Sequence, residues 1–152
     1  LEANIVKEQL KLINNSIEST KYDVGVITPY SGQKNLIRNE IQQIAYNNIN
    51  GNVVVNSVDA FQGGQKDIII YSTVRSSDKH KNIGFLKSEE RLNVAFSRAK
   101  RLLIIVGDAE FLSDTSINDN KFPLVLKYIK ENPEHCRIID YNSLNADGKR
   151  EV

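Results

Sequence analysis

The hydrophobic pattern of the chain alternates between two spacings, and each spacing predicts a different kind of element. Apolar residues at helical spacing predict helices over residues 3–19, 31–46, 89–100, 109–112 and 122–132. Short apolar runs predict strands over residues 24–28, 52–58, 67–74 and 101–108, with a weaker strand over 136–141. Strands that alternate with helices are typical of an α/β domain with a mainly parallel sheet and helices on both of its faces.

Polar and special residues predict where these elements end. Pro29 stops the first strand because proline has no N–H to donate to a sheet, and Ser31 is the expected N-cap of the next helix. The run DIIIYSTV at 67–74 is continuously apolar, which predicts a strand covered on both faces. A polar loop over residues 76–88 follows, and the apolar group at 83–86 closes it.

Composition places the chain among globular proteins and gives no general attraction for nucleic acid. The chain has 152 residues, 40% of them hydrophobic and 26% charged, which suits one domain with a core of its own. Its formal net charge is +1, so any contact with nucleic acid has to be local.

Cysteine and histidine are too scarce to build a covalent or metal framework. Cys136 is alone, so an internal disulfide is excluded, and His80 and His135 lie far apart in sequence, so we expect no metal site. No apolar run approaches the roughly 18 residues of a membrane span. We therefore expect an intracellular, cytoplasmic protein, or a nuclear one if the source is eukaryotic, with no membrane partner.

The ends of the predicted strands carry the candidate chemistry. In parallel α/β sheets, ligands bind beyond the carboxyl ends of the strands. This rule selects three segments: Thr28–Tyr30, Ser57–Gln65 and Val106–Asp108. Their hydroxyls, amides and glycines suit phosphate or sugar oxygens, and the paired glycines Gly63 and Gly64 suit the close approach of a backbone to a ligand.

The signatures of an independent enzyme are missing from the sequence. There is no GxxxxGK[ST] phosphate loop, and the single Gly-Lys pair, Gly148-Lys149, lies in the tail. No GxGxxG, HExxH or nucleophile elbow occurs, and Asp59 and Asp67 do not form an obvious catalytic pair. The chain contains no methionine and begins as if within a helix, so we expect it to be a piece of a larger protein.

Three segments in order resemble motifs IV, V and VI of superfamily 1 helicases, in the branch that contains the nonsense-mediated-decay helicase and senataxin. They are VGVITPYSGQ, SVDAFQGGQKDIIIYSTVRS and IGFLKSEERLNVAFSRAK with the following LLIIVGD. The resemblance covers most of residues 22–108 and is weak in the C-terminal third. It implies a RecA-like three-layer domain, the second motor domain of such a helicase, over residues 1–144, with a disordered tail over 145–152.

The resemblance also implies what the chain lacks. In these helicases the first RecA-like domain carries the phosphate loop and the Mg²⁺ carboxylate, ATP lies in the cleft between the two domains, and single-stranded DNA or RNA crosses both. We therefore expect ATP and Mg²⁺ to act in the full-length protein and to be absent from the isolated domain, whose ATPase activity should be negligible. The expected partners are the first domain and the single strand, and the expected oligomeric state is a monomer.

Arg98, in AFSRAK, resembles the arginine finger of motif VI. A permanently charged, planar guanidinium stabilises negative charge on the transferring phosphoryl oxygens across a domain gap. Helical spacing places Arg98 on one stripe with Arg91 and Val94, and the core-facing residues on another. Spacing alone favours a solvated surface arginine; the motif context favours the catalytic role.

Gln65, with Gly63, matches the motif V position that contacts the nucleotide sugar. The family commonly has glutamate there, and the glutamine of this chain can still accept a hydrogen bond from a ribose hydroxyl, though without an ionised acceptor. Gln62 is a further candidate at the domain interface. The alternative for Gln65 is a turn residue in solvent.

Thr28, Ser57 and Val58 match positions that face nucleic acid in the family. Hydroxyls and backbone amides bind phosphate or sugar without reading bases, which suits a motor that moves along any sequence. Tyr30 is a candidate for stacking on a base, with packing against Pro29 as the alternative. Structural or solvated roles are expected for five other residues: Arg75, Lys79, His80, Lys81 and Arg91.

Two other functions remain open from the sequence. Gln65 and the missing phosphate loop are compatible with a non-hydrolysing RecA-like binding or scaffold module. An unrelated α/β domain with chance motif matches is the other alternative. The sequence does not separate DNA from RNA, because the expected contacts are to the backbone.

Overall fold

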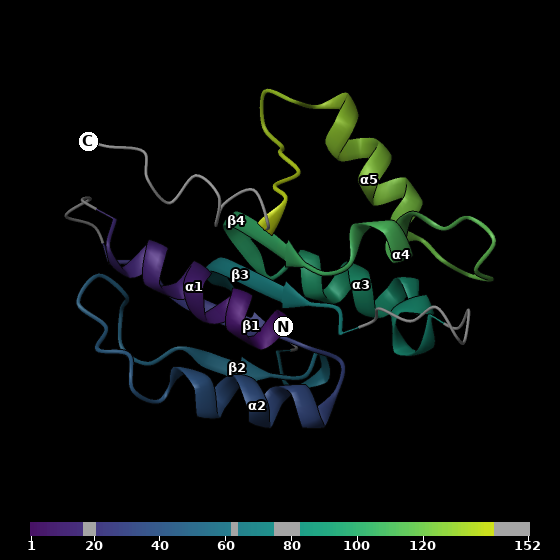
Figure 1. Cartoon of the computed structure of the whole chain (residues 1–152). Coiled ribbons are helices and arrows are strands. Elements are labelled where there is room, and N and C mark those ends of the chain that lie inside the picture. The colour runs from purple at the N-terminus through teal and green to yellow at the C-terminus, as the bar shows by residue number, and fades with distance from the viewer. Residues whose placement is uncertain (17–20, 62–63, 75–82, 142–152) are drawn as a thin grey trace.

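A four-stranded sheet, parallel throughout, organises the computed structural model, which describes residues 1–16, 21–61, 64–74 and 83–141 (Figure 1). The strand order is β2-β1-β3-β4, and every neighbouring pair is parallel. The strands are β1 (Val24–Ile27), β2 (Val54–Asn56), β3 (Lys66–Ser72) and β4 (Ala99–Val106). The predicted α/β class with a parallel sheet is confirmed.

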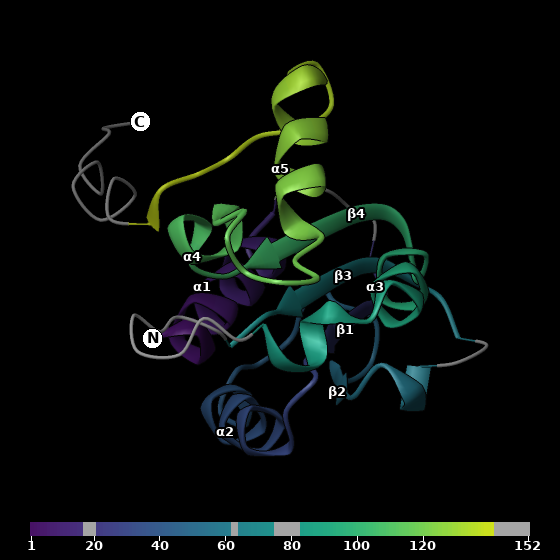
Figure 2. The ribbon, with the colours of Figure 1, turned by 90° about the vertical axis from the view of Figure 1, so that its right-hand side faces the viewer.

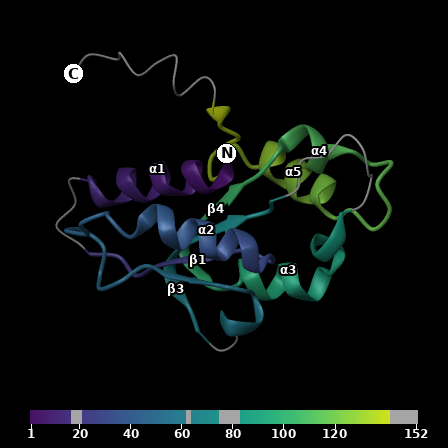
Figure 3. The same cartoon turned by 60° about the horizontal axis from the view of Figure 1, so that its bottom comes forward.

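Two helices cover one face of the sheet, α1 (Glu2–Asn14) and α2 (Ser31–Ile41), which lie side by side in Figures 1 and 3. Alternation along the strands sends every second side chain to this face. The strands contribute Val24, Val26, Ile68 and Ile70, and the helices contribute Val6, Leu10, Ile37 and Ile41. All of these side chains are buried, so they form a continuous hydrophobic layer between the sheet and the two helices.

The opposite face is covered by α3 (Glu89–Phe96), α4 (Ala109–Ser113) and the start of α5 (Phe122–Glu131), with two 3₁₀ turns, η1 (Asp59–Phe61) and η2 (Gly84–Lys87) (Figure 2). The alternate strand residues Ile27, Ile69 and Tyr71 point here, against Leu92 and Ala95 of α3. Burial of β3 on both faces confirms the prediction made from its continuous apolar run.

Several predicted boundaries are wrong. The N-cap of α2 is Tyr30, in extended conformation, so Ser31 is the first helical residue and not the cap, and α2 ends at Ile41 rather than near 46. Helix α3 ends at Phe96 and not at 100, because the chain turns at Ser97 and enters β4 at Ala99.

The predicted weak strand over residues 136–141 is also wrong. The structure assigns no strand there, and Ile138 and Ile139 are exposed. These two side chains do not pack into either hydrophobic core, and β4 remains an edge strand of the sheet. Helix α1 is shorter than predicted, and residues 17–20 and the predicted tail at 145–152 lie outside the described residues.

A glycine in β1 fixes how the segment after β2 crosses the sheet. A Cβ on Gly25 would lie 2.9 Å from Cε1 of Phe61 and 3.1 Å from Cδ1 of Ile69. The Phe61 ring therefore packs directly on the strand backbone, and it anchors η1 against the sheet. This contact holds the segment that follows β2 against the sheet as far as Phe61.

Candidate nucleotide and nucleic-acid sites

Arg98 lies in the turn between α3 and β4, where its guanidinium is held by backbone and hydroxyl oxygens. Its Nε donates to the carbonyl of Val94 at 3.1 Å, Nη1 to the carbonyl of Gly64 at 3.3 Å, and Nη2 to Ser97 Oγ at 3.1 Å. These bonds use three of the five N–H donors of a guanidinium, so donors remain for an external anion. The side chain is half-buried, and its hydrogen bonds to the turn fix the position of the guanidinium.

Gln65 lies beside Arg98, so the structure brings the motif V and motif VI residues together. Nε2 of Gln65 donates to the carbonyl of Ser97 at 3.4 Å, and the Lys66 N–H donates to the carbonyl of Arg98 at 2.9 Å. The exposed amide of Gln65 thereby keeps Oε1 as an acceptor. A guanidinium next to a carboxamide oxygen suits a ligand with phosphate and hydroxyl groups.

The pair sits at the edge of the sheet opposite to the one the sequence predicted. Gln65 directly precedes β3 and Arg98 directly precedes β4, and the strands are parallel, so both residues lie at the amino ends of the strands. The strand-end rule had grouped Gln65 with Thr28 at the carboxyl edge. The segment 57–65 in fact leads from the carboxyl end of β2 back to the amino end of β3.

The predicted nucleic-acid residues do gather at the carboxyl edge. Thr28 follows β1 and Ser57 follows β2, and the Thr28 N–H donates to the Asn56 carbonyl at 3.2 Å. Thr28 and Val58 are only 1% and 4% exposed, while Ser57 is half-buried. Contact through the side chains of Thr28 and Val58 therefore requires local opening, and their roles stay predictions.

The hydroxyl of Thr28 is an unsatisfied polar group. Its Oγ1 is buried and has no hydrogen-bond partner among the described residues. A buried hydroxyl without a partner costs free energy, so this strand end is less stable than its packing alone suggests. The predicted contact with a phosphate or sugar oxygen is one way to satisfy it.

Tyr30 contacts an aromatic residue that the sequence argument did not select. Its ring meets that of Phe85 edge to face, with centroids 5.4 Å apart. The guanidinium of Arg91 lies over the Phe85 ring at 5.8 Å and pairs with Asp59 at 3.6 Å. Below them, burial raises the pKa of the Tyr71 phenol; Tyr30 adds to the rise and Arg91 opposes it.

Glu2 is a second residue that the sequence did not single out. Its two carboxylate oxygens accept from the Val74 N–H at 2.9 and 3.0 Å, and the Ser72 hydroxyl also donates to them. Val74 has φ 63°, a strained value for a β-branched residue, and Glu2 stabilises that turn at the end of β3. Burial raises the pKa of the Glu2 carboxyl, against the lowering effect of these hydrogen bonds.

No feature of the sequence marks Glu2 or Phe85 as special. Glu2 reads as an ordinary acidic residue in the first turn of a helix, and its partners are about 70 residues away along the chain, with Gln33 donating to the same Ser72 at 3.2 Å. Phe85 stands in the apolar group at 83–86 that was expected to close the preceding polar loop. An aromatic residue beside Ile83 and Leu86 was the one available signal.

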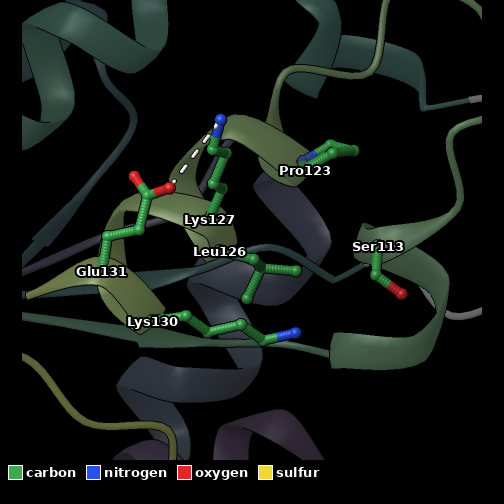
Figure 4. A pocket seen from close by; sticks show the side chains of 6 residues that line it. All are labelled: Ser113, Pro123, Leu126, Lys127, Lys130 and Glu131. Carbon is green, nitrogen blue, oxygen red and sulfur yellow. Dashed lines mark ion pairs between the residues drawn. The ribbon is translucent and has the colours of Figure 1, made fainter. Parts of the chain in front are cut away.

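Hollows of the surface do not coincide with the predicted residues. One, of about 420 Å³, lies between α4 and α5 and is lined by residues that include Leu126, Lys130 and the exposed pair Lys127–Glu131 (Figure 4). Another, of about 450 Å³, lies between α2 and β2. Both are open, and an ATP site shared between two domains would not appear as an enclosed pocket of one of them.

Some candidates cannot be placed. Gln62, Gly63, Arg75 and His80 lie outside the described residues, as do Lys79 and Lys81. Within the described ranges, no group of three or more His, Cys, Asp or Glu side chains is arranged to hold a metal ion. No helix in those ranges has the length and apolar character needed to cross a membrane.

Comparison with known proteins identifies the kind of domain. Residues 1–110 match the family model described as an AAA domain. The chain is 41% identical over 115 residues to the DNA polymerase alpha-associated DNA helicase A of Saccharomyces cerevisiae. It is 44% identical over 113 residues to the regulator of nonsense transcripts 1 of Caenorhabditis elegans, and 40% identical over 114 residues to the probable helicase senataxin of Mus musculus.

The matched region is a small part of each relative. The alignments cover 73–74% of this chain, but 16% of the yeast helicase, 10% of the nematode regulator and 4% of mouse senataxin. Residues 1–110 contain β1–β4 and α1–α3, and therefore every residue of the two candidate sites. Helix α5 lies beyond the matched family region.

Proposed function

Because this chain belongs to the AAA-domain family and its relatives over this region include named helicases, we propose that residues 1–144 form the second RecA-like motor domain of a superfamily 1 helicase, one half of an ATP-driven motor on single-stranded DNA or RNA. The other half is the first RecA-like domain, which carries the phosphate loop. The observation that carries the proposal is the contact between Arg98 and the Gly64–Gln65 turn. A positive charge beside an amide oxygen that can accept from a sugar hydroxyl supports a nucleotide as the ligand.

In this proposal Arg98 acts on the phosphates and Gln65, with Gly63 and Gln62, on the sugar and the domain interface. The residues present fit the ligand, because Arg98 keeps free donors and Gln65 keeps Oε1 as an acceptor. Bound Mg²⁺ would neutralise phosphate charge, and we propose that the first domain holds it. Arg98 would stabilise the charge that develops on the transferring group.

At the carboxyl edge, Thr28, Ser57, Val58 and Tyr30 would contact the single strand. Closure of the inter-domain cleft on ATP and its reopening after hydrolysis would shift these contacts along the strand. The two sites occupy opposite edges of one sheet, and its core layers are closed on both faces. A displacement of the nucleotide residues at the amino edge would therefore also move the strand residues at the carboxyl edge.

Substitution of Arg98 tests this function in the full-length protein. Arg98→Ala should lower ATP turnover by roughly 10³–10⁵-fold, the contribution of an arginine finger to catalysis. Arg101→Ala is the matched control, because Arg101 lies three residues further on, has a 66% exposed side chain and pairs weakly with Asp67 at 3.7 Å. Near-normal turnover by a folded Arg98→Ala protein would contradict the proposal.

The alternative of a non-hydrolysing scaffold module is not favoured, because relatives of this region are named as helicases. We also propose that the full-length motor is a monomer and acts inside the cell. The choice between DNA and RNA is also part of it, since one relative is named a DNA helicase and another a regulator of nonsense transcripts.

A further inference from the structure

An exposed aromatic side chain stands near the carboxyl edge of the sheet, between two buried neighbours. Phe85 is 54% exposed, whereas its neighbours Ile83 and Leu86 are 1% and 0% exposed. The two buried side chains anchor the η2 turn in the core layer and leave Phe85 directed away from it. A large apolar ring fixed in this way exposes area that solvent disfavours, and it loses little conformational freedom on binding a ligand.

Charged and aromatic groups from three other segments surround this ring. Tyr30, from the end of β1, meets it edge to face at 5.4 Å. Arg91, from the first turn of α3, lies over it at 5.8 Å and is paired with Asp59 of η1 at 3.6 Å. The arrangement joins parts of motifs IV, V and VI in one cluster, which we call the Phe85 platform: Tyr30, Asp59, Phe85 and Arg91.

The position of the platform separates it from the nucleotide residues. Tyr30 lies two residues after Thr28, and Asp59 lies two residues after Ser57, so the platform borders the edge where the strand contacts are predicted. Gln65 and Arg98 lie at the opposite ends of the strands. A ligand on the platform would therefore lie closer to the predicted strand residues Thr28 and Ser57 than to Gln65 and Arg98.

We propose that Phe85 is a base-stacking residue, the second aromatic member of a site for a nucleobase of the single strand together with Tyr30. This inference rests on the proposed motor function. Aromatic rings bind any base through its π face, which suits a motor that tolerates every sequence. Arg91 completes the site, because its guanidinium is held over the ring by Asp59 and can stack on a base or pair with a phosphate.

Binding of strands with and without bases tests the proposal in the full-length protein. The variants are Phe85→Leu, which removes the ring but keeps an apolar side chain, and Phe85→Tyr, which keeps the ring. Tyr128→Leu is the matched control, since it removes an exposed aromatic ring from α5, where Tyr128 is 62% exposed. The probes are DNA and RNA oligonucleotides and abasic strands of equal length, with ATP and inorganic tripolyphosphate as a second pair.

Phe85→Leu should weaken binding of the base-containing strand by roughly 5- to 100-fold, the contribution of one stacked base. Binding of the abasic strand should stay unchanged, Phe85→Tyr should restore affinity, and Tyr128→Leu should have no effect. If Phe85→Leu weakened the binding of ATP but not that of tripolyphosphate or of the strands, Phe85 would stack on the base of the nucleotide. That result would overturn the assignment of Phe85 to the single strand.

Equal weakening of strands with and without bases would overturn the proposal, because it would show that Phe85 has only a structural role. No weakening of either strand would overturn it as well. The Arg98→Ala assay separates these failures from failure of the motor function. If Arg98→Ala abolishes turnover while Phe85→Leu binds strands normally, the motor function stands and the stacking role falls.

Discussion

At the scale of single residues, the proposed contact with a nucleotide sugar depends on the amide of Gln65. Its Nε2 is engaged with the Ser97 carbonyl at 3.4 Å, which leaves the neutral Oε1 as the acceptor. The resembling helicases commonly have glutamate at this position. An ionised acceptor makes hydrogen bonds about twice as strong as a neutral one, so this chain should hold the sugar more weakly.

Gln65→Glu in the full-length protein should therefore lower the KM for ATP by roughly fivefold, which corresponds to about 1 kcal/mol of added hydrogen-bond strength. The gain should disappear with deoxy analogues of ATP that lack the contacted hydroxyl. An equal gain with ATP and the analogues would point to a general charge effect instead. A fall in kcat would show that the new carboxylate captures Arg98.

Glu2 gives the domain a stability that depends on pH. Burial is the largest influence on its carboxyl and raises its pKa above the usual value of 4.5. The folded state then binds a proton that the unfolded state has released, so this contribution is fully present below about pH 4.5 and is lost as the pH rises through the folded pKa.

The difference in unfolding free energy between wild type and Glu2→Gln, measured by guanidinium denaturation at several pH values, should follow this sign. Wild type should lose stability relative to Glu2→Gln as the pH rises from 4.5, by about 1.4 kcal/mol for each unit by which the pKa is raised. Other titrating groups cancel in the difference. A difference that does not change with pH, or that changes in favour of wild type, would contradict the role of burial.

Phe85 and Glu2 show why some contacts between single residues cannot be predicted from the sequence. Arg98 and Gln65 were selected because local motifs mark them, and the structure places them together. Glu2 acts on Val74, and Phe85 acts on Tyr30, across 72 and 55 positions of the chain. Such contacts depend on how the elements pack, and no spacing within a segment encodes them.

At the scale of elements, the close packing of Gly25 on Phe61 makes a sharp prediction. Gly25→Ala should destabilise the chain by about 1–3 kcal/mol, because the added methyl would lie 2.9 Å from the Phe61 ring in a packed layer. Urea denaturation of the 152-residue chain measures this. Displacement of Phe61 should also disturb the segment that leads to Gln65.

Gly32→Ala is the matched control for this substitution. Gly32 lies in α2, and a Cβ there would have no atom within 4 Å, so alanine should stabilise the helix by about 0.5–1 kcal/mol. Opposite signs for the two glycines are expected. Equal stability of the two variants would show that the Phe61 contact has no part in fixing the segment.

Most elements could be predicted because their signals are local. The apolar run at 67–74 gave β3, and the pattern at 122–132 gave α5, with its Pro in the first turn. Boundaries failed where tertiary structure decides: α3 gives way to β4 only because Arg98 and Lys66 join the turn to β3. The segment at 136–141 has strand-like composition, yet it does not pair with the edge strand β4, and Ile138 and Ile139 stay exposed.

At the scale of the whole molecule, the sheet separates two kinds of contact. Gln65 and Arg98 lie before β3 and β4, whereas Thr28 and Ser57 lie after β1 and β2. The sequence rule for parallel sheets pointed to the carboxyl edge, but a segment that joins two parallel strands must return to the amino edge, and Gln65 therefore lies there, directly before β3. The proposed coupling between ATP and strand needs both edges on one rigid body, which the two closed core layers supply.

In the proposed motor, Arg98 stabilises the transition state of ATP hydrolysis in the full-length protein. The most direct measurement compares the affinities of wild type and Arg98→Ala for ADP with aluminium fluoride, which mimics the transferring phosphoryl group, and for a non-hydrolysable ATP analogue. Arg98→Ala should weaken binding of the transition-state mimic by roughly 10³-fold or more and that of the ATP analogue by less than about tenfold. Equal weakening of both ligands, or weakening of neither, would contradict the claim.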